Sequence, residues 1–486
     1  MKQEKEEEQV YWTVCMACHG LGKKNKGPRK KARINKQTLD TSIEPLRVSI
    51  SHFSTCSKCA GSGIVPASCP PPVDITYPHV AIIGGGIGGM ALAVACLHRG
   101  IPFTLYERDL HFDARSQGYG LTLQQASKVM KDFGLLTLED EVISTKHIVH
   151  DTDGKILGEW GFRKWQTTAQ QPTQKRNNIH IARQSLRFAL FNQLGAYQDI
   201  QWGHQLLDYK PINEQEIELT FQVNGAFKTA KTNLLVGADG IRSSIRKLSL
   251  GEELAPLHYL GCMVILGICS LATVKNLTNS LLLDGETVFQ TANGQERIYI
   301  MPYKKDSVMW QLSFPIEENE ARVLAALGPE ALKEEACRRT LWHDPIPQLV
   351  QATLAVQISG YPVYDRKIVD ATSWKEKNAI TLLGDAAHPM SPFKGQGANQ
   401  ALLDALLLAR MITKGCTATT QWRERGLRKS VLTAFETAMF ERSATKVKGS
   451  AQAAQLLHSA LVLTPCDQPR GSLIKSKSEA TTTAFP

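Results

Sequence analysis

A glycine-rich turn at the start of the chain's apolar region has the spacing of a phosphate-binding loop. Gly84, Gly86 and Gly89 form a Gly-x-Gly-x-x-Gly pattern between the apolar run 79–83 and the apolar helical segment 87–99. The first glycine permits a tight turn, the second lets the backbone approach a pyrophosphate, and the third allows close helix–strand packing. Glu107 ends a second β-rich run, 103–106, where a carboxylate can accept hydrogen bonds from ribose hydroxyls. These residues predict a dinucleotide site.

Two further segments place an aspartate directly after an apolar run. The run 233–236 leads into Gly237-Ala-Asp239-Gly240, and the run 379–383 leads into Gly384-Asp385. The second segment continues through Pro392 and the glycines at 395 and 397 into a helical pattern. The glycine turn alone does not distinguish FAD from NAD, so the identity of the dinucleotide depends on these two segments.

With these three motifs in this order, residues 78–415 resemble the class A flavoprotein aromatic hydroxylases. That group contains para-hydroxybenzoate hydroxylase, kynurenine 3-monooxygenase and the tetracycline-inactivating monooxygenases. The resemblance implies a glutathione-reductase-like fold with FAD as its cofactor and NAD(P)H as the electron donor. It implies that O2 adds at the flavin C4a to give a hydroperoxide, which hydroxylates an aromatic or polycyclic small molecule. An epoxidase or a reductase on the same fold is an alternative.

The resemblance also implies roles for individual residues. Asp385 is expected to hold the ribityl or ribose region of FAD, and Asp239 to serve both FAD and NAD(P)H. Arg115 and Arg183 are expected near the flavin, and His388 is expected to orient its loop rather than to catalyse. Helix N–H groups after the last glycines can stabilise negative charge on the reduced ring. The expected cofactor residues are Gly84, Gly86, Gly89, Glu107, Arg115, Arg183, Asp239, Asp385, Pro392, Gly395, Gly397, Ala398 and Asn399; no side chain is expected to be catalytic, because the flavin carries the chemistry.

Four cysteines near the N-terminus have the spacing of a metal site. Cys15, Cys18, Cys56 and Cys59 lie in two copies of Cys-x-x-Cys-x-Gly-x-Gly. Two such turns can present four thiolates to one tetrahedral Zn²⁺. The pattern resembles the zinc region of DnaJ-type chaperones, although only two of that family's four repeats are present and 37 residues separate the pairs. We expect one zinc ion; redox-active pairs and unstructured cysteines are the alternatives.

The zinc module leaves a second interpretation of the whole chain open. A chaperone-like or scaffold protein could use the module to bind a protein partner while its flavin domain is catalytically idle. Between the two cysteine pairs lies the basic run 23–33, which we interpret as a solvated loop. No nucleic-acid partner is expected.

The composition of the chain and the distribution of its charged residues indicate how the domains that position these residues are organised. The chain has 486 residues with 43% hydrophobic and 21% charged, enough for a sizeable core. The net charge is +10, of which residues 1–60 contribute 12 Lys or Arg against 6 Asp or Glu. We expect an α/β protein with a Rossmann-like FAD-binding domain over 76–415. A mostly antiparallel β-sheet substrate domain is expected within it, at about 145–175 and 250–365.

The remaining segments flank this domain. We expect a zinc-binding module with a proline-rich linker over 1–75, helices over 416–463 and a disordered tail over 464–486. The charged segment 1–8 lacks the apolar stretch of a signal peptide, and the longest apolar run, 260–272, is shorter than the roughly 20 residues of a spanning helix. A cytoplasmic protein without a transmembrane segment is therefore expected.

Overall fold

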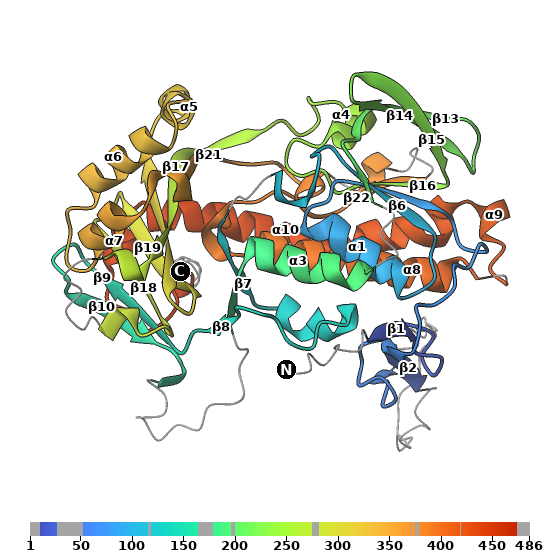
Figure 1. The fold of residues 1–486 in the computed structure, drawn as a ribbon, viewed down its shortest axis with the longest axis horizontal. Coiled ribbons are helices and arrows are strands. Elements are labelled where there is room, and N and C mark those ends of the chain that lie inside the picture. The colour runs from blue at the N-terminus through green and yellow to red at the C-terminus, as the bar shows by residue number, and fades with distance from the viewer. Residues whose placement is uncertain are drawn as a thin grey trace, which may run out of the picture.

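The protein is described by a computed structural model over residues 10–26, 52–114, 118–163, 178–195, 200–274, 281–369, 371–374, 379–417 and 419–473. Two sheets lie at opposite ends of the long axis, and the long helix α10 (Thr433–Leu457) spans the distance between them (Figure 1). None of the described helices combines the length and apolar composition needed to cross a bilayer.

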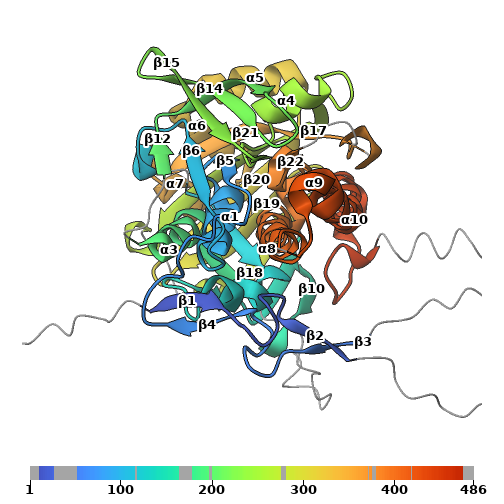
Figure 2. The same ribbon diagram turned by 90° about the vertical axis from the view of Figure 1, so that its right-hand side faces the viewer.

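The first sheet is parallel and has five strands. Its central strands are buried apolar runs, as expected for a sheet covered on both faces. Helices α1 (Ile87–Leu97), α3 (Arg183–Leu194) and α8 (Gly397–Gly415) lie on one side of it (Figure 2). A three-stranded sheet, β13 (Gln205–Pro211), β14 (Ile217–Val223) and β15 (Ala226–Thr232), lies on the other. The strand order is β12 (Ile200–Trp202), β6 (Phe103–Glu107), β5 (Val80–Ile83), β16 (Leu234–Gly237) and β22 (Ile380–Leu382).

The second sheet has seven strands and is antiparallel except where β9 pairs with β18. Helices α5 (Glu318–Ala326), α6 (Pro329–Arg339) and α7 (Ile346–Ala352) pack on one face around the buried Trp310 and Phe314. The strand pattern of the sequence did not predict these helices. The order is β10 (Ile156–Trp160), β9 (Lys146–His150), β18 (Thr287–Ala292), β19 (Arg297–Lys304), β20 (Ser307–Pro315), β17 (His258–Ser270) and β21 (Ile358–Asp365).

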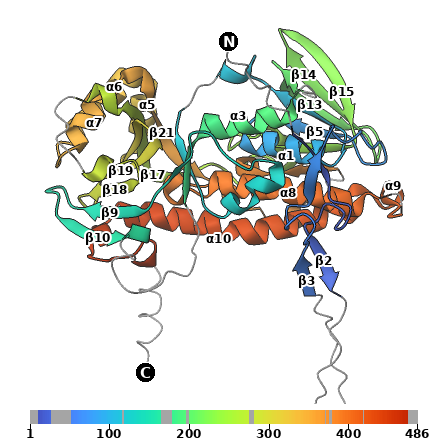
Figure 3. The ribbon, with the colours of Figure 1, turned by 60° about the horizontal axis from the view of Figure 1, so that its bottom comes forward.

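The C-terminal part of the described chain is helical and connects the two sheets. After α9 (Trp422–Arg425) and a π-helical segment, η9 (Arg428–Leu432), helix α10 runs from the parallel sheet to the antiparallel one (Figure 3). At its far end, Nε2 of His458 lies 2.9 Å from Oγ of Ser313 on β20.

The predicted disordered tail needs a correction over 464–473. The N–H of Cys466 donates to Leu157 O at 2.9 Å, and the N–H of Glu159 donates to Asp467 Oδ1 at 3.0 Å. This segment therefore satisfies backbone groups at the edge of β10, which gives it a defined position. Residues 474–486 lie outside the described residues.

Four short strands form a separate module at the N-terminus. Strand β1 (Tyr11–Val14) pairs with β4 (Ile64–Ala67), and β2 (Lys23–Lys26) pairs with β3 (His52–Thr55). The module lies beside α1 and α8 at the edge of the domain built on the parallel sheet, as Figures 1 and 2 both show. The 3₁₀ segment η2 (Ala126–Phe133) also contacts it, because Trp12 packs against the αL residue Gly134 that ends η2.

Candidate functional site

The sequence motifs meet at one edge of the parallel sheet. Gly84 follows β5, Glu107 ends β6, Asp239 follows β16 and Asp385 follows β22, so each lies at the carboxyl end of its strand. Since the strands are parallel, these ends share one edge, which is where ligands bind in open α/β sheets. The convergence follows from the topology alone.

The glycine turn has the geometry that its spacing predicts. Gly84 has φ of +108°, and a Cβ on Gly89 would lie 1.9 Å from Gly84 O, so any side chain there would push α1 off the turn. Gly86 precedes α1, and no described atom lies within 4 Å of the position of its missing Cβ. No described side chain caps this helix N-terminus. The turn therefore offers free space beside exposed N–H groups, which suits a phosphate.

Glu107 closes one side of the glycine turn. Its Oε2 accepts from Gly85 N at 2.6 Å, and its Oε1 accepts from Asp109 N at 3.0 Å. Arg187, on α3, donates to Gly85 O at 2.8 Å and stacks on Phe112 at 4.3 Å. The turn is thus held from both sides, and each carboxylate oxygen of Glu107 keeps a lone pair for a ligand hydroxyl.

Hydrogen bonds join the loop that carries Asp239 to the loop that carries Asp385. Oδ2 of Asp239 accepts from Ser244 N, the first N–H of helix α4 (Ser244–Leu250), at 2.7 Å, while Ser243 caps the helix and burial raises the pKa of the Asp239 carboxyl. Two residues into α4, Arg246 is 3% exposed and donates to Ala386 O at 2.9 Å and to Ala387 O at 3.0 Å. The Asp239 loop therefore fixes the backbone that carries Asp385.

Asp385 is open to solvent although protein atoms surround it, and we call this position the recess. Its side chain is exposed to solvent, yet desolvation by the surrounding protein raises its pKa, against the lowering effects of His388 and Arg183. A group with both properties is reached by solvent but is surrounded by protein atoms. Arg183 begins α3, and its guanidinium lies 5.5 Å from the ring centroid of Tyr119. Residues from α3 and from the β22 loop therefore converge here.

The start of α8 borders the same recess. A Cβ on Gly397 would lie 3.4 Å from Oδ1 of Asp385, and no described side chain caps the helix at Gln396. Before the helix, Pro392 opens the 3₁₀ turn η8 (Pro392–Lys394), and Gly395 ends this turn in the αL conformation with φ of +58°. Ala398 follows in the first turn of α8. This helix N-terminus presents a second set of free N–H groups.

Asn399 does not face the recess through its amide. Its Oδ1 accepts from Gln124 N at 2.8 Å and from Ala126 N at 3.0 Å. Its Nδ2 donates to Thr122 O and to Gly395 O, both at 2.8 Å. Four hydrogen bonds use the full capacity of an amide, so this side chain joins α8 to β7 (Gly120–Leu123) and η2 rather than contacting a ligand.

An aromatic wall faces the recess from the antiparallel sheet. Tyr361 on β21 is 38% exposed, yet burial of its hydroxyl raises its pKa, with Tyr119 and Asp385 adding to the effect. Tyr119 and Phe393 pack against the same apolar cluster on β17 and β21, which includes Cys262 and Val363. Apolar and phenolic side chains therefore lie opposite the Asp385 loop.

The predicted cofactor residues that the structure describes lie at this edge of the parallel sheet, except that the side chain of Asn399 is turned toward β7 and η2. Arg115 lies outside the described residues. Sequence reasoning missed Arg187, Arg246 and Asp404, which hold the motif loops through backbone carbonyls or amides. Because such bonds join residues distant in the chain, no local spacing indicates them.

The four predicted metal ligands also converge. Sγ of Cys15 lies 3.9 Å from that of Cys56, and Sγ of Cys18 lies 3.7 Å from that of Cys59. Four thiolates around one Zn²⁺ at about 2.3 Å would be about 3.8 Å apart. The N–H groups of Gly22 and Gly63 donate to Cys18 Sγ and Cys59 Sγ at 3.3 Å and 3.2 Å, so the donor set fits a tetrahedral thiophilic metal. The alternative of unstructured cysteines does not agree with this cluster.

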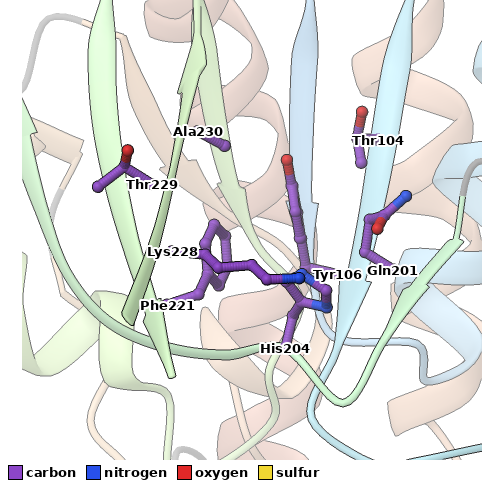
Figure 4. Close-up of a pocket in the computed structure, with 8 residues that line it drawn as sticks. All are labelled: Thr104, Tyr106, Gln201, His204, Phe221, Lys228, Thr229 and Ala230. Carbon is purple, nitrogen blue, oxygen red and sulfur yellow. The ribbon is translucent and has the colours of Figure 1, made fainter. Parts of the chain in front are cut away.

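Two cavities lie away from the motif loops. One, of about 300 Å³, lies between the parallel sheet and β13–β15, where Tyr106 and Phe221 stack at 4.3 Å and Lys228 extends toward His204 (Figure 4). The other, of about 540 Å³, is lined by the end of β21 and by α10. Neither is lined by a predicted cofactor residue.

A family model described as FAD binding domain matches residues 77–422. The aurachin C monooxygenase/isomerase of Stigmatella aurantiaca is 29% identical over 350 residues, which covers 69% of this chain and 80% of that protein. The 6-hydroxynicotinate 3-monooxygenase of Bordetella bronchiseptica is 25% identical over 342 residues, covering 69% of this chain and 82% of that protein.

The fold is also found among solved structures. Klebsiella pneumoniae HpxO, solved in complex with FAD and uric acid, has a TM-score of 0.64 to this chain at 18% identity. The match covers 83% of this chain and 92% of that one. The likeness supports the fold, and the N-terminal cysteine module precedes the residues of the family match.

Proposed function

The chain belongs to the FAD binding domain family, and from this premise we propose that it is an FAD-dependent monooxygenase that hydroxylates an aromatic small molecule with NAD(P)H and O2. One oxygen atom of O2 enters the product, the other leaves as water, and NAD(P)H supplies the two electrons. The observation that carries the proposal is the convergence of four motif loops and two uncapped helix N-termini on one edge of the parallel sheet.

The residues present fit FAD along its length. The N-terminus of α1 beside Gly86 would take the pyrophosphate, and Glu107 the adenosine ribose. Asp385 would hold the ribityl region, with Arg183 and Asp239 nearby. When bound, FAD supplies the electron transfer and oxygen chemistry that side chains do not supply.

The chain's own residues have separate tasks in this mechanism. The free N–H groups at the start of α8 would stabilise negative charge on a bound flavin, through the helix dipole and direct donation. Asn399 holds these N–H groups in position through its four backbone hydrogen bonds. Apolar side chains of the antiparallel sheet keep water from the reacting carbon.

The aromatic side chains opposite Asp385 favour an aromatic substrate. Tyr361, Tyr119 and Phe393 offer ring faces, and the two tyrosines add hydroxyl groups that can orient a polar substituent. The relatives named for aurachin C and for 6-hydroxynicotinate support this substrate class. Polycyclic aromatics belong in the same panel of candidates.

Anaerobic mixing with NADPH or NADH, followed by air, tests the proposal. We expect the flavin absorbance to bleach faster in the presence of the right aromatic compound and to recover with oxygen. The product should be heavier by one oxygen atom. A protein that purifies colourless and takes up no FAD would refute the proposal and favour the scaffold interpretation.

We also propose that Cys15, Cys18, Cys56 and Cys59 bind one Zn²⁺. Their sulfur separations and the two N–H donors to sulfur support this assignment. All four coordination positions are protein thiolates, which is typical of a structural site rather than a catalytic one. Metal analysis of the purified chain should give one zinc per chain; a metal-free chain with an intact flavin would refute the zinc site alone.

A further inference from the structure

Three basic side chains of the FAD-binding domain reach the cysteine module. Lys131 on η2 donates to Ala60 O at 2.7 Å, and Arg410 on α8 donates to Ser62 O at 2.9 Å. Arg99, just after α1, donates to Gly20 O at 3.4 Å. Gly20, Ala60 and Ser62 belong to the two tight turns that carry the cysteines. The domain therefore contacts the module through cations from three separate elements.

Arg99 is unusual because its guanidinium is buried without a carboxylate partner among the described residues. The residue is 3% exposed, and burial lowers its pKa to about 10. Its guanidinium donates to two backbone oxygens, Ala95 O at 3.0 Å and Gly20 O at 3.4 Å. The Asp132 carboxylate acts on Arg99 only through space, raising its pKa, because it pairs directly with Arg410 at 3.1 Å. A buried cation in such a setting is costly unless a negative charge lies close to it.

The metal-loaded module would supply that charge. One Zn²⁺ bound by four thiolates has a net double negative charge, the four cysteines are buried, and the Cys18 thiol acts electrostatically on Arg99. We propose that Arg99, Lys131 and Arg410 form an anion-binding seat for the metal-loaded, dianionic cysteine module, so that the FAD-binding domain stabilises the metal-bound form over the metal-free form. The inference depends on the zinc site proposed above.

The anion-binding seat and the proposed flavin site are built on the same two elements, η2 and α8. Segment η2, which carries Lys131, begins at Ala126, whose N–H donates to Asn399 at the start of α8. Arg410 lies on the same helix, α8, near its other end. The elements that hold the module are therefore the elements that position the free N–H groups beside Asp385, as the stacking of the module below α8 in Figure 2 illustrates.

The closing experiment measures metal affinity in the intact flavoprotein. Co²⁺ is the probe, since its tetrahedral thiolate absorption lies at longer wavelength than that of the flavin, and a competing chelator sets the free-metal level. We expect Lys131→Met to weaken Co²⁺ binding by about threefold, as for a largely exposed charge. Arg99→Met should weaken it by about tenfold, because the charge is buried. Lys131→Arg, which keeps the positive charge, should bind Co²⁺ with the affinity of the unaltered chain.

The control is Lys128→Met, on the same 3₁₀ segment and exposed. It should bind Co²⁺ as the unaltered chain does. If Arg99→Met does not fold, Lys131→Met still decides, since its side chain is at the surface. Equal Co²⁺ affinity in Lys131→Met, Lys128→Met and the unaltered chain would overturn the seat while leaving the metal site intact. A chain that binds neither Co²⁺ nor Zn²⁺ would overturn the metal site itself, and the seat with it.

Discussion

Nε2 of His388 lies 2.7 Å from Oδ2 of Asp404, and neither side chain is accessible to solvent. The same carboxylate oxygen accepts from Gly384 N at 3.0 Å, and Arg442 on α10 donates to the other oxygen. An ionised carboxylate only accepts hydrogen bonds, so the His388 ring donates through Nε2. Two helices therefore hold the loop that carries Asp385, and His388 has an orienting role.

The first prediction concerns the charge at the centre of this network. Asp404→Asn leaves Arg442 without its carboxylate and removes an acceptor for His388. Breaking a buried pair from one side costs about 3 kcal/mol, so we expect a lower unfolding temperature. FAD should also be lost more readily on desalting, because the Asp385 loop loosens. Differential scanning fluorimetry and the flavin absorbance measure both effects.

The exposed Glu334→Gln is the matched control, since it removes one acid from a helix surface. It should leave both the unfolding temperature and the flavin content unchanged. An Asp404→Asn protein that matches this control in both measurements would show that the network does not position the loop.

A second prediction separates two glycines of one turn. A Cβ at position 86 would meet no described atom within 4 Å and the φ of −74° is allowed for any residue, so Gly86→Val should fold. It should retain little FAD, because the side chain occupies the space beside the α1 N–H groups. Gly89→Val would place Cβ 1.9 Å from Gly84 O and should destabilise the fold itself. Circular dichroism and flavin content after purification distinguish the two variants.

If Gly86→Val binds FAD as the unaltered chain does, the pyrophosphate does not lie at this turn. Full stability of Gly89→Val would mean instead that α1 can move away from β5 at little cost.

The sequence predicted the parts of the site that depend on local geometry. The turn at Gly84 and the carboxylate at Glu107 follow from strand, turn and helix in succession, so spacing alone indicates them. Arg187 and Arg246 could not be predicted in this way, because their acceptors, Gly85 O and Ala386 O, lie 102 and 140 residues away. An arginine that donates to a distant carbonyl has no sequence signature.

Contacts between distant residues were also not predictable for the cysteine module and for the C-terminal segment 464–473. The cysteine spacing predicted that four thiolates would meet, since each pair forms a tight turn by itself. It did not predict the contacts with Lys131 and Arg410, which depend on how the module packs. Residues 464–473 lack periodicity because they bind as an irregular segment along β10, where Cys466 supplies a backbone donor.

A third prediction concerns acid stability. His180 is fully buried, with Nδ1 3.1 Å from Thr122 Oγ1 and Nε2 2.8 Å from Ser144 Oγ, and burial lowers its pKa to about 3. Below its unfolded pKa of 6.5 the unfolded chain binds a proton that the folded chain does not. Stability should therefore fall by about 1.4 kcal/mol per pH unit for this group between pH 6.5 and 3.

His180→Gln should reduce that slope by one proton while lowering stability at pH 7 through altered packing. Urea unfolding at pH 7.0, 6.0 and 5.0 gives the slope for each protein. The exposed His258→Gln provides the comparison, because its ring stands at the surface beside Asp365. Equal slopes for His180→Gln and the unaltered chain would mean that His180 is protonated in the folded protein.

The fourth prediction links the metal to the flavin. Removing the metal ligands with Cys56→Ser and Cys59→Ser should abolish metal content, because two thiolates do not complete a tetrahedral zinc site. Metal binding contributes directly to the folding of such small modules, so the module should lose its fixed contacts with η2 and α8.

Since Asn399 joins η2 to the start of α8, FAD should dissociate about fivefold faster at the same temperature. Dilution into an excess of an apoprotein that binds FAD tightly, which captures the released flavin, would measure the rate. Cys69→Ser is the control, because this exposed cysteine lies outside the cluster, and it should keep both zinc and the original rate. A metal-free double variant that releases FAD at the rate of the Cys69→Ser protein would show that the module folds without influence on the flavin site.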